Sequence, residues 1–146
     1  MKDEVIQVLD LTFVSVETFG FTELEVDLST KPEKSVGSEE RWALATSALE
    51  AALKGRGVAY QIDPGEGVFY GPKIDIKIKD ALGRSWQCSP IKVDFNHPER
   101  LDLGHIAEDG KVHPPIMIPS AVKGSNERSY GTPIVKHGCA FRPRPP

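Results

Sequence analysis

The strongest constraint on the fold comes from two β-type segments separated by a short turn. In KIDIKIK (73–79) three isoleucines alternate with charged residues, a pattern typical of a half-buried strand. The turn DALGR (80–84) follows, and RSWQCSPIKVDF (84–95) is a second β segment. Turns as short as DALGR and the earlier DPGEG (63–67) join antiparallel neighbours, so the sequence predicts β-hairpins at both places.

Two helices and three further β segments accompany this pair. Apolar residues at helical spacing predict helices over residues 5–16 and 42–53. Strand patterns occur at 24–28, at VAYQI (58–62) and at PPIMIPSAV (114–122). The expected fold class is therefore α+β, with an antiparallel sheet flanked by helices.

The composition is that of an ordinary soluble domain. With 146 residues, of which 39% are hydrophobic and 27% charged, the chain suits one domain with a real core. The formal net charge of −3 argues against a general nucleic-acid or membrane-surface binder, although a local basic patch remains compatible with it.

Two further features bear on the compartment. No long apolar run predicts a membrane span, and MKDEVIQVLD carries acids where a targeting peptide would not, so we expect a cytoplasmic protein. Cys88 and Cys139 are far apart and form no C-x-x-C motif, which disfavours a disulfide framework or a cysteine zinc site.

Some patterns are weak evidence for a site by themselves. GEG (65–67) is better explained by turn geometry than by phosphate binding. The histidines form no i, i+4 pair, so exposed residues are a better interpretation than metal ligands. They are His97, His105, His113 and His137.

The segment KGSNER (123–128) is more informative. Ser125 can cap a helix, which places Arg128 on the first turn, and a guanidinium at a helix N-terminus is a natural phosphate site. From this motif alone, an arginine on a solvated first turn is the better interpretation. Tyr70 and Gln87, on adjacent β segments, are by themselves better interpreted as core residues that each make one hydrogen bond.

Seven segments, taken in order, resemble the catalytic core of threonyl-tRNA synthetases, which are class II enzymes. The resemblance covers about residues 1–132, and residues 133–146 form a divergent proline-rich tail. The combination of LSTKPEK and GRSWQC is similar to the threonine enzymes rather than to class II synthetases in general. The segments are FGF (19–21), LSTKPEKSVGS (28–38) with Trp42, GEGVFYGPKIDI (65–76), DALGRSWQC (80–88), VDF (93–95), PIMI (115–118) and GSNER (124–128).

The resemblance implies roles for four residues. Arg128 matches the motif 3 arginine that binds the ATP phosphates, and Gln87 matches a glutamine that contacts ATP and the adenylate. Tyr70 and Lys73 match residues that line the threonine and adenylate pocket. The implied activity is ATP-dependent activation of threonine and its transfer to tRNA(Thr) by a homodimer. No nucleophilic catalytic residue is expected, since such a reaction depends on positioning and charge neutralisation.

The chain also departs from the family pattern. Pro90 and Lys92 stand where the family usually has threonine and glutamine, and Pro119 and Ser120 stand where it has histidine and arginine. That histidine is a ligand of the catalytic zinc, and because proline cannot coordinate a metal, we expect no zinc here. The other zinc ligands, motif 1, the motif 2 arginine and the editing and anticodon-binding domains would lie outside these 146 residues.

Two functional hypotheses follow. The first is a fragment of a threonine–tRNA ligase catalytic core that is inactive by itself. The alternative is a non-catalytic relic acting as a nucleotide-binding or protein-interaction module. An unrelated α+β ligand-binding domain is disfavoured by the length of the match.

Gly131 and Pro133 are expected to interrupt the helix that follows Arg128.

Overall fold

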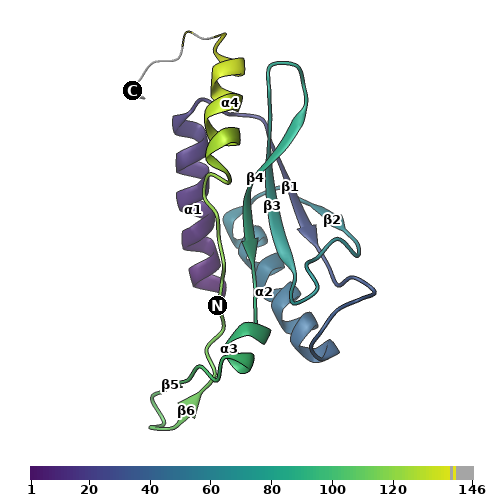
Figure 1. Ribbon diagram of the computed structural model, residues 1–146, viewed down its shortest axis with the longest axis vertical. Helices are drawn as coiled ribbons and strands as arrows, with labels where there is room; N and C mark the ends of the chain where they lie inside the picture. Colours follow the sequence, from purple (N-terminus) through teal and green to yellow (C-terminus); the bar gives the residue numbers. More distant parts are fainter. Residues whose placement is uncertain (139, 141–146) are drawn as a thin grey trace.

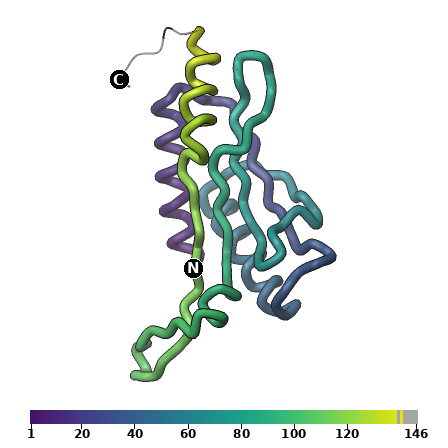
Figure 2. The backbone as a smooth tube through the Cα atoms, viewed as in Figure 1, coloured from purple at the N-terminus to yellow at the C-terminus, as the bar shows by residue number. Residues whose placement is uncertain are grey.

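The computed structural model describes residues 1–138 and 140 and has the α+β architecture that the sequence predicts (Figure 1). Figure 2 traces the same path, with the first and last helices running side by side next to the sheet. Among the described residues, no helix combines the length and apolar character that crossing a membrane requires. The elements are α1 (Lys2–Thr18), β1 (Leu24–Ser29), α2 (Glu39–Arg56), β2 (Gln61–Asp63), β3 (Lys73–Lys79), β4 (Ser85–Lys92), α3 (Asn96–Arg100), β5 (His105–Ile106), β6 (Val112–His113) and α4 (Asn126–Lys136).

The main sheet has the strand order β2-β1-β3-β4. β3 pairs antiparallel with both β1 and β4, so the predicted DALGR hairpin is confirmed. The hairpin predicted at DPGEG is wrong, because β2 pairs parallel with β1 and lies on the opposite side of β1 from β3. Turn residues show where a chain reverses, but they do not show which strand edge it joins next. Of the strand predicted at 58–62, only its end contributes to β2.

Asp80 fixes the turn between β3 and β4. Its Oδ1 accepts hydrogen bonds from the backbone N–H groups of Leu82 and Arg84, both at 2.9 Å, and its Oδ2 accepts from Trp86 Nε1 at 3.0 Å. The hydrogen bond from Trp86 is the largest cause that holds the pKa of Asp80 well below its ordinary value of 3.8, with the bonds from Arg84 and Leu82 adding to it. The carboxylate therefore pins both the turn and the start of β4.

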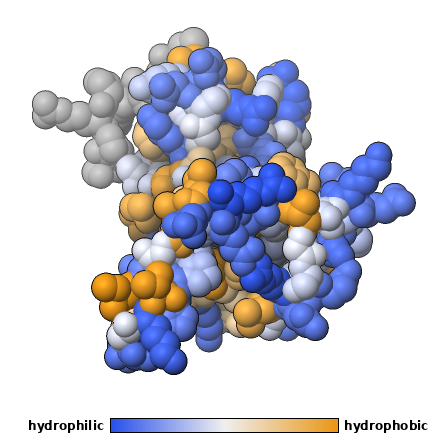
Figure 3. All heavy atoms as spheres, turned by 60° about the horizontal axis from the view of Figure 1, so that its bottom comes forward, coloured by the Kyte–Doolittle hydropathy of each residue, from blue (hydrophilic) through white to orange (hydrophobic). Residues whose placement is uncertain are grey.

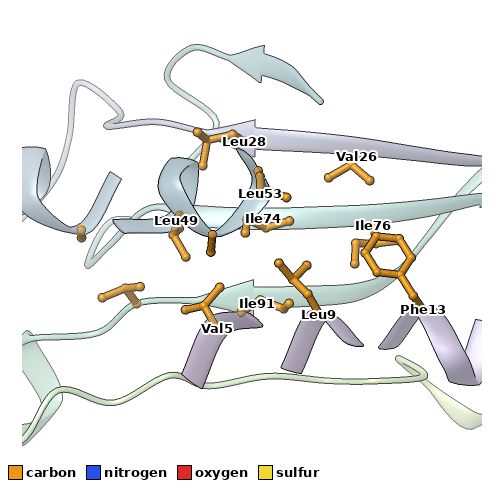
Figure 4. Close-up of a cluster of buried hydrophobic side chains, with 13 residues drawn as sticks. Val5, Leu9, Phe13, Val26, Leu28, Leu49, Leu53, Ile74, Ile76 and Ile91 are labelled. Carbon is orange, nitrogen blue, oxygen red and sulfur yellow. The ribbon is translucent and has the colours of Figure 1, made fainter. Parts of the chain in front are cut away.

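The core lies between one face of the sheet and the two long helices. Burying an Ile or Leu side chain contributes about 1.5–3 kcal/mol, so this layer is the main source of stability. Figure 4 shows the side chains of both helices converging on the strands. The labelled residues are Val5, Leu9 and Phe13 of α1, Leu49 and Leu53 of α2, and Val26, Leu28, Ile74, Ile76 and Ile91 of the sheet.

The opposite face of the sheet is polar. Strand alternation puts Asp27, Lys73, Asp75, Lys77 and Gln87 on this face. The charges are paired across strands: Lys77 Nζ lies 2.5 Å from Asp27 Oδ2, and the hydrogen bond to Asp27 is the main cause that raises the Lys77 pKa. One face of each strand thus builds the core, and the other builds a charged surface.

Residues 116–122 run along the free side of β4 without forming a regular strand. Asp94 and Met117 exchange both backbone hydrogen bonds, at 2.9 and 3.0 Å. Lys92 N donates to Pro119 O at 3.0 Å, and Ala121 N donates to Pro90 O at 3.1 Å. In both of these pairs the reciprocal bond is impossible, since proline has no N–H. The strand predicted at 114–122 is therefore reduced to isolated bridges.

The last helix continues further than the sequence predicts. α4 runs to Lys136 through Gly131 and Pro133, so the expected interruption of this helix is wrong. Pro133 cannot donate a hydrogen bond, but its carbonyl still accepts one from His137 N at 2.9 Å, which keeps the last turn closed. The helix therefore crosses the boundary at residue 132 that the sequence suggested, and half of the proline-rich segment 133–146 lies outside the described residues.

Candidate nucleotide site

The candidate site lies where α4 begins beside β4. Ser125 Oγ accepts a hydrogen bond from Arg128 N at 3.3 Å, so the predicted helix cap is confirmed. Arg128 Nη1 donates to the backbone carbonyl of Gln87 at 2.8 Å. The two residues that the sequence assigned to ATP are therefore in direct contact, although they are separated by 41 positions.

Gly124 brings the helix start this close to β4. Its φ is +68°, a conformation that L side chains rarely adopt, and a Cβ there would lie 2.5 Å from Cys88 O. Any larger residue would push Ser125 and Arg128 away from the strand. Sequence reasoning did not single out Gly124, although its place directly before a capping serine was an available signal.

Gln87 and Lys73 meet on the same carboxylate. Gln87 Nε2 donates to Asp75 Oδ1, and Lys73 Nζ lies 2.6 Å from Asp75 Oδ2. Asp75 is buried, and Lys73 is mostly so. A buried carboxylate with two such partners is well compensated and holds both side chains in place. The structure thus brings two of the predicted substrate-binding residues together through Asp75, which the sequence analysis missed.

Tyr70 lies just before the start of β3, next to α3. Its ring makes edge contacts with Phe69 and His97, with centroids 5.0 and 5.5 Å away. It lines a cavity of about 120 Å³. Trp42, Phe95 and the ion pair of Arg41 with Glu99 also line this cavity.

Gly71 fixes the position of Tyr70 against β4. A Cβ at Gly71 would lie 1.8 Å from Val93 O, so only glycine allows this backbone approach. Val93 N in turn donates to Pro72 O at 3.1 Å. The glycine in FYGPK is therefore a packing requirement that places the preceding tyrosine.

Asp94 and His97 form a pair that the sequence analysis missed. Asp94 is 2% exposed, and its Oδ1 accepts from the backbone N–H groups of Asn96 and His97 at 2.8 and 3.0 Å. Its Oδ2 binds His97 Nδ1, which directs the imidazole toward Tyr70. The signal was an aspartate three residues before a histidine at a helix start, but spacing alone does not show that the carboxylate is buried.

Cys88 is the buried neighbour of Gln87 on β4. Burial raises the pKa of its thiol above the ordinary value of 9.0, while the charge of Arg128 acts in the opposite direction. Because the net direction is upward, the thiol stays protonated at neutral pH. Cys88 is therefore a packing residue rather than a nucleophile.

The residues at the zinc position of the resembled family do not fit a metal. Pro119 has no donor atom in its side chain, and its carbonyl already accepts from Lys92 N. Within residues 1–138 and 140, no group of three or more His, Cys, Asp and Glu is arranged to hold an ion. The side chains around Pro119 thus give no basis for a zinc-dependent step.

Comparison with known proteins identifies the relatives of this chain. Residues 1–132 match the family described as tRNA synthetase class II core domain (G, H, P, S and T). The chain is 52% identical over 143 residues to the threonine–tRNA ligase of Nitrosococcus oceani, covering 98% of this chain and 22% of the relative. It is 54% identical over 131 residues to that of Synechococcus sp. (strain WH7803), covering 90% and 22%. The chain thus spans about a fifth of the length of these relatives.

Solved structures are similar as well. The RNA binding domain of threonyl-tRNA synthetase from Cryptosporidium parvum Iowa II superposes with a TM-score of 0.89 at 39% identity, covering 94% of this chain and 34% of that chain. Putative threonyl-tRNA synthetase ThrRS-1 from Aeropyrum pernix superposes with a TM-score of 0.78 at 28% identity, covering 91% of this chain and 32% of that chain. Histidyl-tRNA synthetase from S. aureus gives 0.63 at 16% identity, covering 96% and 38%, which shows a shared fold alone.

Proposed function

Because the chain belongs to the family of class II tRNA synthetase core domains, we propose that it is part of a threonine–tRNA ligase catalytic core that binds ATP but does not activate threonine by itself. The observation that supports ATP binding is the contact between Arg128 and Gln87 at the start of α4. It joins the motif 3 arginine of the resemblance to the strand that carries the glutamine.

In this proposal Arg128 binds phosphate oxygens. A guanidinium carries five N–H donors, and the hydrogen bond to Gln87 O uses one of them while fixing the orientation of the fork. The N-terminus of α4, capped by Ser125, adds a favourable dipole close to Arg128. An anionic triphosphate is a ligand that suits both features.

Gln87, Lys73 and Tyr70 would contact threonine and the adenylate. Asp75 holds Gln87 and Lys73, and His97 packs against Tyr70, so none of the three side chains depends on substrate for its position. Preorganised groups of this kind lower the cost of ordering on binding. The remaining partners in the proposal are tRNA(Thr) and a second synthetase subunit, in the cytoplasm.

The chain by itself lacks groups that the reaction requires. Activation is attack of the threonine carboxylate on the α-phosphate, so the protein must hold two reactants in register. Correct positioning can account for about 7–11 kcal/mol of a barrier. Pro119 offers no zinc ligand to read the threonine hydroxyl, and Lys92 places a cation where the substrate ammonium would be repelled. A phosphate contact from Arg128 improves ATP binding, but it does not align the threonine carboxylate with the α-phosphate.

The alternative is a non-catalytic module, and one cavity favours a protein partner. Between α1 and α4 lies an apolar cavity of about 400 Å³. Phe19, Cys88, Tyr130 and Pro133 are among the residues that line it. A surface of this kind can accept an apolar side chain from another protein.

The first test measures binding of Mg·ATP to the 146-residue chain by titration calorimetry. Charge-assisted hydrogen bonds contribute about 1.5–3 kcal/mol, so Arg128→Ala should weaken binding by about 10- to 100-fold. Arg100→Ala is the matched control, because Arg100 is also an exposed arginine of a helix but lies on α3. Equal binding by the two variants would contradict the proposed phosphate site.

The second test measures threonine-dependent exchange of pyrophosphate into ATP, with zinc supplied. We expect exchange at the level of a control without threonine. Clear exchange that Arg128→Ala abolishes would show that the chain is an active enzyme by itself. Binding without exchange would support the proposal as stated.

A further inference from the structure

The β5–β6 hairpin brings two histidines together that are eight residues apart in the sequence. His105 lies directly opposite His113 in the antiparallel pair, and both side chains are exposed. Their ring centroids are 6.4 Å apart, with an angle of 49° between the ring planes. The hairpin projects from the end of the molecule next to α3 (Figure 1), far from the start of α4.

The turn holds this register firmly. Ala107 N donates to Lys111 O at 3.0 Å, and Gly110 N donates to Ala107 O at 2.9 Å. Gly110 has a φ of +73°, which closes the loop in the left-handed conformation that glycine adopts without strain. The backbone therefore keeps the two imidazoles on facing positions of the hairpin.

Asp109 orients one of the two rings. Its Oδ2 lies 2.9 Å from His113 Nε2, and its Oδ1 accepts from Lys111 N at 2.9 Å. An ionised carboxylate favours the tautomer with the proton on Nε2, which leaves the Nδ1 lone pair of His113 available.

We propose that His105 and His113 chelate a divalent transition metal ion of the Zn²⁺, Ni²⁺ or Cu²⁺ class, with Asp109 as a positioning residue. Imidazole is a ligand that these ions prefer, and a carboxylate on the second ring nitrogen is a common support for a metal-binding histidine. With Zn–N bonds of about 2.1 Å, the rings need to approach by about 1 Å, which exposed side chains can do by rotation. Two protein ligands leave the other positions to water.

This site is separate from the proposed nucleotide site and from Pro119. The sequence analysis looked for histidines at the i, i+4 spacing of a helix and found none. His105 and His113 are brought together by strand pairing instead, which that spacing does not detect. Figure 3 brings this end of the molecule forward, where hydrophobic and hydrophilic side chains are mixed on an accessible surface. A metal ion can reach such a surface without any opening of the fold.

The test is titration of the full chain with ZnCl₂ by calorimetry, above the ordinary imidazole pKa of about 6.5. We expect one Zn²⁺ per chain and a loss of affinity of roughly tenfold or more in both His105→Gln and His113→Gln. Asp109→Asn should weaken binding several-fold, because it removes the charge that orients His113. The signals of both imidazoles in proton–nitrogen NMR spectra should shift on addition of zinc.

Two control variants make the result decisive. His137→Gln removes a histidine at the opposite end of the molecule, and Cys139→Ser removes a thiol that could compete for zinc; both should bind as the unmodified chain does. The proposal is overturned if zinc does not bind, if either histidine variant of the hairpin binds normally, or if a control variant loses binding. Unchanged affinity in Asp109→Asn would overturn the role given to Asp109. Circular dichroism of each variant confirms that the fold is kept.

Discussion

Strand β4 has a neighbour on each side, and the two pairings differ. Toward β3 the ladder extends from Lys92 opposite Lys73 to Ser85 opposite Lys79, with one bulge at Ile76/Lys77. Toward residues 116–122 only isolated bridges form. Pro90 belongs to both pairings but disturbs only the second, because its missing N–H would point away from β3. A proline in a strand thus weakens the one neighbour that its N–H would face.

The largest expected effect comes from a change on the regular side of β4. Ile74 is 0% exposed and lies opposite Ile91, whereas Ile116 on the irregular side is 42% exposed. Ile74→Ala should lower the free energy of unfolding by about 2–5 kcal/mol, because it leaves a cavity in the core. Ile116→Ala, the matched control, should cost less than about 1 kcal/mol. Urea denaturation measures both, and similar losses would mean that the two sides of β4 are equally well packed.

The next effect concerns the turn that docks α4 on β4. Gly124→Ala meets both a φ of +68° and the carbonyl of Cys88, so we expect a loss of about 2–3 kcal/mol together with weaker ATP binding. Gly57→Ala is the control, because Gly57 has a φ of +70° but no atom within 4 Å of the added Cβ. It should cost about 1 kcal/mol and leave ATP binding unchanged. Equal effects on binding would show that α4 does not depend on the close approach at Gly124.

The smallest expected effect on stability comes from replacing the two prolines that interrupt the pairing of β4 with residues 116–122. Pro90→Thr combined with Pro119→His restores two N–H donors, each worth about 0.5–1.5 kcal/mol in a hydrogen bond. The more flexible unfolded chain offsets about 0.4–1 kcal/mol for each replacement. The net change should therefore stay within about 1 kcal/mol, and hydrogen exchange is the better measurement.

In the repaired variant, the amides of residues 90 and 119 should exchange slowly, and protection of Met117 and Ala121 should rise. The β3 side of β4 serves as the internal control and should not change. Fast exchange at both restored amides would show that the prolines are not the reason for the isolated bridges.

Much of the candidate site follows from the sequence, but its connections do not. The position of Arg128 on a first turn could be predicted from Ser125, since a cap acts within three residues. Its contact with Gln87 depends on Gly124 lying against Cys88, a long-range packing event. The role of Asp75 was missed because the alternation of a strand predicts a polar face, but it does not show that Gln87 and Lys73 both bind the same carboxylate on that face.

The sequence by itself determined the local features of this protein: the periodicities of α1, β3 and β4, the DALGR hairpin and the capped start of α4. Each rests on interactions within a few residues, which a linear pattern contains. Only the tertiary structure decided the parallel edge strand β2, the two unequal sides of β4 and the meeting of His105 with His113. The first two depend on which distant segments pair and in what register, a choice that burial of the core fixes, whereas the third depends on the turn that closes the exposed β5–β6 hairpin.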